Sequence, residues 1–206
     1  MRLRPRGRGG RMTVMKTEPR ESVIAVAIAR QLGAGGGILG KRLAKRLGAV
    51  YLDRAILRLA AERLGACSAE LGRWDGRLPG FWERFTETFS AGAPDCTYTT
   101  GRNLTGVSSQ VLFEQETRVV REAAARRSVV VVGRAGGWML EGHPRLARIY
   151  LHAPVEARLP EVMRRYNLTD EREARNQMAR MDIERERFIL EMTRCAVSDA
   201  RNHDLC

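Results

Sequence analysis

Long apolar runs are missing from this 206-residue chain. No stretch approaches the ~20 residues that a transmembrane helix requires, which excludes a membrane-integral protein of that kind. The first residues, MRLRPRGRGGR, are basic, but neither an apolar stretch nor a small-residue cleavage site follows them, so they do not indicate a secretory signal. With 44% hydrophobic and 29% charged residues, the composition is that of a soluble, globular chain of one-domain length.

Cysteine and histidine are also few. The four cysteines form no C-x-x-C pair, and the three histidines have no ligand-like spacing beside them. The pattern therefore argues against a zinc site and against a disulfide framework. Scattered thiols fit the reducing cytoplasm, where we expect the protein to act.

Lysine occurs only three times, so arginine supplies nearly all of the positive charge. Residues 1–22 carry seven basic residues against two glutamates, which gives this arm +5 of the net charge of +12. The arm lacks apolar periodicity and is predicted to be disordered; a nucleic-acid-binding tail is the less favoured alternative. The remaining +7 suits a partner that bears phosphates.

Apolar runs and helical spacings alternate along residues 23–206. A buried strand is predicted at 23–29, a helix at 38–48 and a second strand at 49–53, which together form a βαβ unit. Further strands are expected at 128–133, 146–153 and, only begun, 203–206, and further helices at 55–65, 108–127, 136–142, after Pro154 and at about 170–195. Residues 66–107 have no steady period and are predicted to be an insertion with its own small core. Pro160 should kink its helix or shift the start. The pattern predicts an α/β fold with a mainly parallel sheet of five strands, the last one truncated.

The stretch RQLGAGGGILGKRLA, residues 30–44, joins the first strand to the first helix and contains five glycines. Glycine permits positive φ values, which turn successive N–H groups inward at the positive end of a helix. The stretch therefore predicts an anion cradle, with a tight packing turn as the alternative. The lysine that usually closes a phosphate loop is absent, because position 36 is glycine; Arg30, at the end of the strand, could partly substitute.

These residues resemble the cytidylate kinase-like family, a branch of the P-loop nucleoside monophosphate kinases. Arg30 and the lysine-free glycines match that branch's S-R-x-x-G-S-G-G-x-x-I-G pattern. Further matches are V-V-V-V-G-R at 129–134, I-Y-L-H-A-P-V-E-A-R at 149–158, and D-x-x-R at Asp182 and Arg185. The resemblance extends over residues 22–206 and implies a three-layer P-loop fold. It implies one domain over 23–206, an acceptor-side insertion at about 54–115 and lid helices at about 160–190.

The resemblance also implies a reaction and a site. The reaction is transfer of a phosphoryl group from ATP, bound with Mg²⁺, to a nucleoside monophosphate, with cytidylate favoured. The residues that would cradle the phosphates of ATP are Gly33, Ala34, Gly35, Gly36 and Gly37. Asp53 would orient waters on Mg²⁺ or the acceptor, or else would only cap a helix. The arginines Arg58 and Arg134 would bind the acceptor's phosphate. Arg180, Asp182 and Arg185 would belong to the lid, or else to a solvated helix face.

Three departures from the family pattern keep other functions open. The chain has Gly133-Arg134-Ala135 where ordinary cytidylate kinases have G-R-D, and Met178 stands where an early lid arginine is expected. Family members also continue beyond N-x-D-L into a completed fifth strand, whereas this sequence ends at Cys206. The alternatives are a nucleotide-binding protein with little or no turnover and a kinase for another small acceptor. The sequence leaves the oligomeric state open.

Overall fold

The computed structural model describes residues 23–53, 109–133 and 135–206. In this part of the chain, four parallel strands form one sheet in the order β2-β3-β1-β4. The strands are β1 (Ala25–Arg30), β2 (Val50–Asp53), β3 (Val129–Val132) and β4 (Leu146–Leu151). The predicted α/β fold with a parallel sheet is confirmed. Because the strands are parallel, their carboxyl ends lie at one edge of the sheet.

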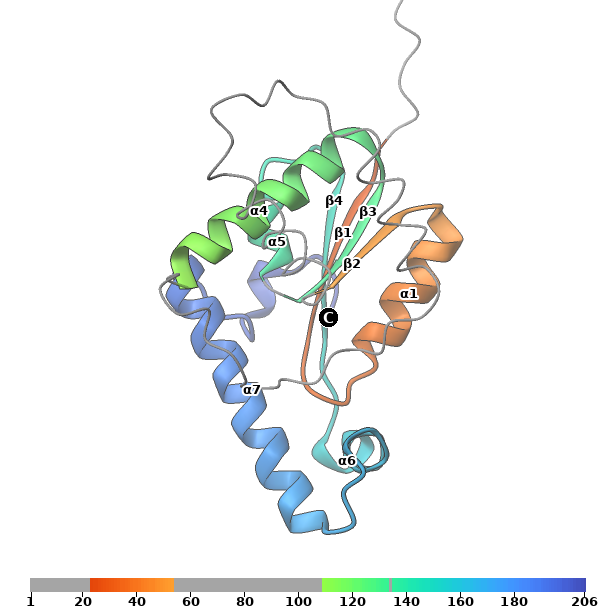
Figure 1. Ribbon diagram of the computed structural model, residues 1–206, viewed down its shortest axis with the longest axis vertical. Helices are drawn as coiled ribbons and strands as arrows, with labels where there is room; N and C mark the ends of the chain where they lie inside the picture. The colour runs from red at the N-terminus through yellow and green to blue at the C-terminus, as the bar shows by residue number, and fades with distance from the viewer. Residues whose placement is uncertain (1–22, 54–108, 134) are drawn as a thin grey trace, which may run out of the picture.

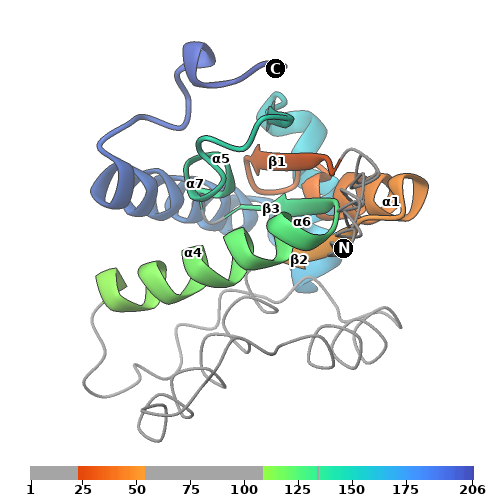
Figure 2. The same cartoon turned by 90° about the horizontal axis from the view of Figure 1, so that it is seen from above.

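Helices cover both faces of this sheet (Figure 1, Figure 2). The helix α1 (Gly36–Leu47) packs on the face formed by Val26, Ile28, Val130 and Val132. The other face, formed by Ala25, Ala27, Val129 and Val131, is covered by α4 (Ser109–Arg126) and α5 (Gly136–Met139). Successive side chains of a strand point to opposite faces, so the apolar runs of β1 and β3 serve both layers.

The helices α6 (Val155–Tyr166) and α7 (Glu171–Thr193) pack against each other below the carboxyl edge of the sheet, where they cross (Figure 1). Asn167 ends α6 in the left-handed conformation, at φ 54°, and Asp170 caps α7 by accepting a hydrogen bond from the Arg172 N–H. Pro160 lies inside α6, which nevertheless starts directly after Pro154, so the start of the helix is not shifted.

The prediction of five strands is wrong for the described residues, where the sheet has four. The end of the chain contributes one bridge only, in which Leu205 lies parallel to Ile149 of β4. A 3₁₀ turn, η1 (Ala200–Asn202), occupies the chain immediately before this point. Pairing therefore begins at Asp204 and Leu205, whose N–H groups both reach the carbonyl of Arg148.

Several predicted elements lie outside the described residues: the basic arm 1–22, the helix 55–65 and the insertion 66–107. Of the acceptor-side segment predicted at 54–115, the described part is residues 109–115, which belong to α4. Among the helices of the described ranges, none has the length and hydropathy of a membrane span.

Candidate active site around the glycine loop

Residues 31–35, here called the glycine loop, connect the carboxyl end of β1 to the start of α1. Gly33 and Gly35 both have φ of 80°, a conformation that favours glycine. Gly35 is the N-cap of α1 and offers no side chain to the first turn, while Gly36 and Gly37 form the start of that turn. The positive end of a helix of twelve residues therefore opens onto the loop without a capping side chain, which is the arrangement of an anion site.

The predicted cradle residues Gly33, Ala34, Gly35, Gly36 and Gly37 are thus brought together at this end of α1. Their main-chain groups are not equivalent. The Ala34 N–H donates to the Gln31 carbonyl over 3.3 Å and closes a turn within the loop. A Cβ placed on Gly35 would meet nothing within 4 Å, so the loop is open to a ligand there.

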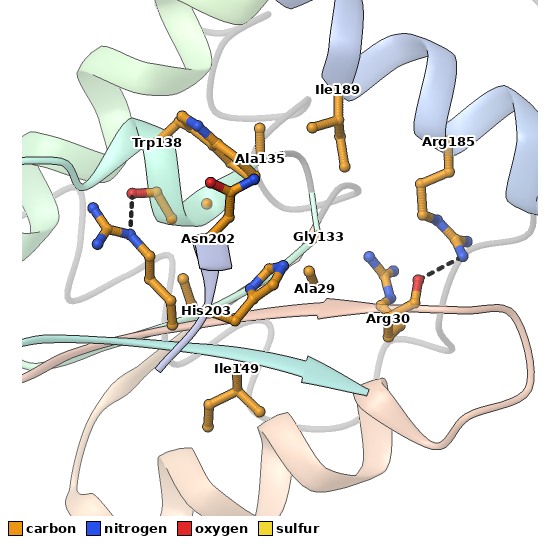
Figure 3. A pocket seen from close by; sticks show the side chains of 14 residues that line it. Ala29, Arg30, Gly133, Ala135, Trp138, Ile149, Arg185, Ile189, Asn202 and His203 are labelled. Atoms are coloured by element: carbon orange, nitrogen blue, oxygen red, sulfur yellow. Dashed lines mark hydrogen bonds between the residues drawn. The ribbon is translucent and has the colours of Figure 1, made fainter. Parts of the chain in front are cut away.

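Arg30 crosses from the glycine loop to the end of β3 (Figure 3). A Cβ on Gly36 would lie 2.8 Å from its Cγ and 3.2 Å from its Cδ. A Cβ on Gly133, whose φ is 81°, would lie 2.9 Å from its Cζ. The stem of Arg30 therefore occupies the space above position 36, and its guanidinium lies against Gly133. A side chain at position 36 would therefore have to displace Arg30.

Asp53 ends β2 at the same edge of the sheet, in register with Val132 of β3. Its side chain is buried, with only 4% of the residue exposed. A carboxylate at this edge suits a role in orienting Mg²⁺ waters or the acceptor. The alternative, a helix cap, concerns the helix predicted at 55–65, which lies outside the described residues.

Asp182 and Arg185, predicted as lid residues, both contact the chain leading into the glycine loop. The Asp182 Oδ1 accepts a hydrogen bond of 2.7 Å from the Leu32 N–H. The Arg185 Nη1 donates to the Arg30 carbonyl over 2.9 Å and lies 3.2 Å from the Asp182 Oδ1. The structure therefore ties the middle of α7 to the loop, whereas contact with a nucleotide stays a prediction for these two residues.

Arg158 is a third charged residue at this place, and the sequence interpretation missed it. It lies in α6, where only 5% of its surface is exposed. Its Nη1 donates to the Leu32 carbonyl over 2.8 Å and to the Asp182 Oδ2 over 2.7 Å, and its Nε donates to the Ala153 carbonyl over 2.9 Å. We call Arg158, Asp182 and Arg185 the loop anchor. The sequence feature that could have pointed to Arg158 was its position at the end of the A-P-V-E-A-R match at 153–158.

Arg180, which lies among the described residues, does not join this group. Arg180 is exposed, with 72% of its side chain accessible, and its Nε lies 3.9 Å from the Glu184 Oε1 on the same helix. Arg58 and Arg134 lie outside the described residues, so their predicted role at the acceptor's phosphate stays a prediction.

A small pocket adjoins Arg30 on the face of the sheet opposite α1. Arg185 and Ile189 of α7, Trp138 of α5 and His203 close its sides (Figure 3). Among the described residues, no group of three or more His, Cys, Asp or Glu side chains is placed to hold a metal ion directly.

Comparisons with known proteins agree with this geometry. The model of the cytidylate kinase-like family matches residues 25–206. An uncharacterized protein from Eubacterium ventriosum ATCC 27560 has a crystal structure similar to this chain, with a TM-score of 0.63 and 19% identity over 89% of this chain and 86% of that one. At this identity the likeness shows the fold alone. No curated protein matches the chain.

Two kinases of known structure are less similar to this chain. A gluconokinase from Sinorhizobium meliloti 1021 gives a TM-score of 0.42 at 14% identity, over 80% of this chain and 75% of that one. A shikimate kinase from Acinetobacter baumannii, in complex with shikimate, gives 0.39 at 21% identity, over 84% and 81%. Scores this low support no conclusion by themselves. The family match, in contrast, extends from the first strand to the last residue, and the chain belongs to the cytidylate kinase-like family.

Proposed function

We propose that this protein is a P-loop kinase that transfers the γ-phosphoryl group of ATP to a nucleoside monophosphate, with cytidylate as the acceptor. The observation that carries the proposal is the course of Arg30. Its side chain starts beside the glycine loop, which would hold the donor, and ends against Gly133. Gly133 directly precedes Arg134, the residue expected to bind the acceptor's phosphate. A fixed positive charge between donor and acceptor is what phosphoryl transfer requires.

The residues at the carboxyl edge divide the remaining tasks. Main-chain N–H groups at the start of α1 would hold the polyphosphate, because the glycines let its oxygens approach closely. Arg30 would offset the charge that spreads over the transferred group, in the place of the usual lysine. Asp53 would orient a metal-bound water or the acceptor. These groups position and stabilise, and no covalent intermediate with the protein is needed.

Mg²⁺ fits this set of residues through the nucleotide rather than through a protein cage. It prefers one or two carboxylates together with substrate phosphates, and Asp53 offers a buried carboxylate at the right edge of the sheet. When bound, Mg²⁺ would neutralise charge on the phosphate oxygens.

A coupled ADP assay with Mg²⁺ and a panel of CMP, UMP and AMP tests the proposal. We expect turnover with CMP and much less with the others. Arg30→Ala should lower kcat by about 10²–10³-fold, the usual cost of one preorganised charge. Arg134→Ala should mainly raise the KM for the acceptor. Arg46→Ala, an exposed arginine near the end of α1, is the matched control and should change neither constant.

The glycine at position 36 favours one second candidate, a nucleotide-binding protein without appreciable turnover, because the usual catalytic ammonium is absent there. A rise in melting temperature with ATP, but no product with any monophosphate, would support this candidate and overturn the kinase. Turnover with a different small acceptor would retain phosphoryl transfer and overturn only the choice of cytidylate.

A further inference from the structure

Leu32 is held by its N–H, its carbonyl and its side chain at once. The Asp182 Oδ1 accepts from its N–H at 2.7 Å, and the Arg158 Nη1 donates to its carbonyl at 2.8 Å. Its side chain is buried in the core between α6 and α7, which also contains Leu159, Val162, Ala174, Met178 and Met181. The residue that opens the glycine loop is therefore fixed to the helix pair and not only to β1.

The next residue is fixed by packing. A Cβ on Gly33 would lie 2.8 Å from both the Arg158 carbonyl oxygen and the Val162 Cγ2. The backbone of the loop thus lies directly on α6. Upstream, the Arg30 carbonyl is taken by Arg185. Polar main-chain groups on both sides of Gln31 are consequently bound by side chains of α6 and α7.

Arg158 is the residue that joins these contacts. It is nearly fully buried, and it bridges the loop carbonyl to Asp182, while its Nε reaches the Ala153 carbonyl at the start of α6. A planar guanidinium can make these bonds in fixed directions, which an ammonium cannot. Buried ion pairs contribute little net stability compared with apolar packing, so their effect on conformation is the property to test here.

We propose that Arg158 is a positioning residue, which sets the conformation in which the glycine loop presents its N–H groups to a phosphate-bearing ligand. This inference rests on the proposed function for its kinetic consequence. A loop with positive φ at Gly33 and Gly35 has few conformational restraints of its own. The loop anchor supplies them from outside, because Leu32 cannot shift without breaking bonds to both Arg158 and Asp182.

Arg158→Lys and Asp182→Asn are the informative variants. Lysine at position 158 keeps the positive charge but lacks the planar guanidinium with its several N–H donors. Asparagine at position 182 keeps an acceptor for the Leu32 N–H but lacks the negative charge. Arg164→Lys is the matched control, since Arg164 makes an exposed pair with Glu161 on the same helix. At a temperature well below melting, both test variants should lower kcat/KM for ATP by about 10–100-fold, as misplacement by about 1 Å does.

Two further measurements distinguish a positioning role of Arg158 from a contribution to stability alone. The KM for the acceptor should stay within about twofold of the wild type, because the two substituted residues, Arg158 and Asp182, bind the glycine loop at Leu32, on the donor side. Amide hydrogen exchange of Leu32 and Ala34 should accelerate in the test variants and not in Arg164→Lys. A folded Arg158→Lys protein with unchanged exchange and unchanged kcat/KM for ATP would overturn the proposal. If Arg158→Lys does not fold, the nearly isosteric Asp182→Asn decides by the same criteria.

Failure of the proposed function would look different. If the wild type neither binds ATP nor turns it over, the kinase assignment fails. The role of Arg158 is then still decided by two measurements: hydrogen exchange of the Leu32 and Ala34 amides, and binding of inorganic pyrophosphate as the probe ligand. Faster exchange and weaker pyrophosphate binding in Arg158→Lys would support it. Equal exchange and equal binding would overturn it.

Discussion

Arg30 and Gly36 occupy adjoining space, so their substitutions should depend on each other. A methyl group at position 36 would meet the near part of the Arg30 side chain, its Cβ and Cγ, at 3.1 and 2.8 Å. We expect Gly36→Ala to destabilise the protein by about 1–3 kcal/mol, the usual cost of overpacking. In an Arg30→Ala background the same change should cost much less, because the obstructing stem is gone.

Urea denaturation of the four proteins of this double-mutant cycle measures the coupling. Gly48→Ala provides the control, since Gly48 ends α1 far along the helix and a Cβ there meets nothing within 4 Å. Alanine is strained at the φ of 59° found at Gly48, so Gly48→Ala should destabilise the protein. Its effect should nevertheless add to that of Arg30→Ala. Additivity of Gly36→Ala with Arg30→Ala would contradict the packing described here.

Asp53 provides the second prediction for a single residue. Asn fits the same buried space but lacks the negative charge, so Asp53→Asn should fold and yet lower kcat by about 10²-fold or more. Steady-state kinetics over a range of Mg²⁺ concentrations measure this loss. An unchanged kcat would show that Asp53 serves only as a structural residue.

At the scale of the elements, the glycine loop and the helix pair α6–α7 share a core. Leu32, 6% exposed, is the loop's contribution to it. Leu32→Ala should reduce the free energy of unfolding by about 2–4 kcal/mol, as expected for a buried leucine that leaves a cavity. Leu47→Ala, at an exposed position of α1, should cost far less. Equal losses in urea denaturation would contradict the burial of Leu32.

The short turn η1 carries a pH-dependent contact. Hydrogen bonds from the Arg201 side chain, and then from its N–H, lower the pKa of Asp199 from its ordinary 3.8 to about 2. Because the folded pKa is the lower one, this contact stabilises the fold above pH 3.8, and the stabilisation is lost as the pH falls through about 2. Arg201→Gln should raise the pKa of Asp199 toward 3.8, which NMR titration of its carboxyl carbon would detect. An unchanged pKa would disprove the assignment of the shift to Arg201.

At the scale of the whole molecule, a bound ligand should stabilise the complete fold and not only the glycine loop, because the loop connects the sheet, α1 and the α6–α7 pair. ATP with Mg²⁺ at about 100 times its Kd should add about 2.7 kcal/mol, or roughly 5–10 °C in Tm. Calorimetry measures this rise, and Arg30→Ala should reduce it at the same ATP concentration. A wild-type Tm that does not respond to ATP would contradict nucleotide binding.

The fold was predictable because its strands are continuous apolar runs and its helices have regular spacing. The strand β3 is four valines, and such a run cannot be anything but buried. The fifth strand, predicted as only begun at 203–206, is reduced in the described residues to one bridge between Leu205 and Ile149. Local pattern could not reveal this, because pairing with β4 is a long-range contact.

The site was predictable only in part, for the same reason. The cluster of glycines predicts the anion cradle from local sequence alone. The position of Asp53 at the sheet edge is predicted by its place at the end of a strand. The loop anchor joins residues more than 120 positions apart, as in the bond between Arg158 and the Leu32 carbonyl. Besides the match at 153–158, a second local clue was in α7, where Arg185 lies on the buried side with Ala174, Met178, Met181 and Ile189, while Arg180 does not.

The helix α7 has 23 residues, and Asp182 is its middle one. Its first half packs on α6, and its second half reaches α4 (Figure 1). There the rings of Phe188 and Phe113 meet edge to face, with 6.1 Å between their centroids. Asp182 and Arg185 bind the chain at Arg30 and Leu32 from the middle of this helix. Because the same helix also packs on α6 and on α4, we expect substitutions at either contact to alter the position of the glycine loop.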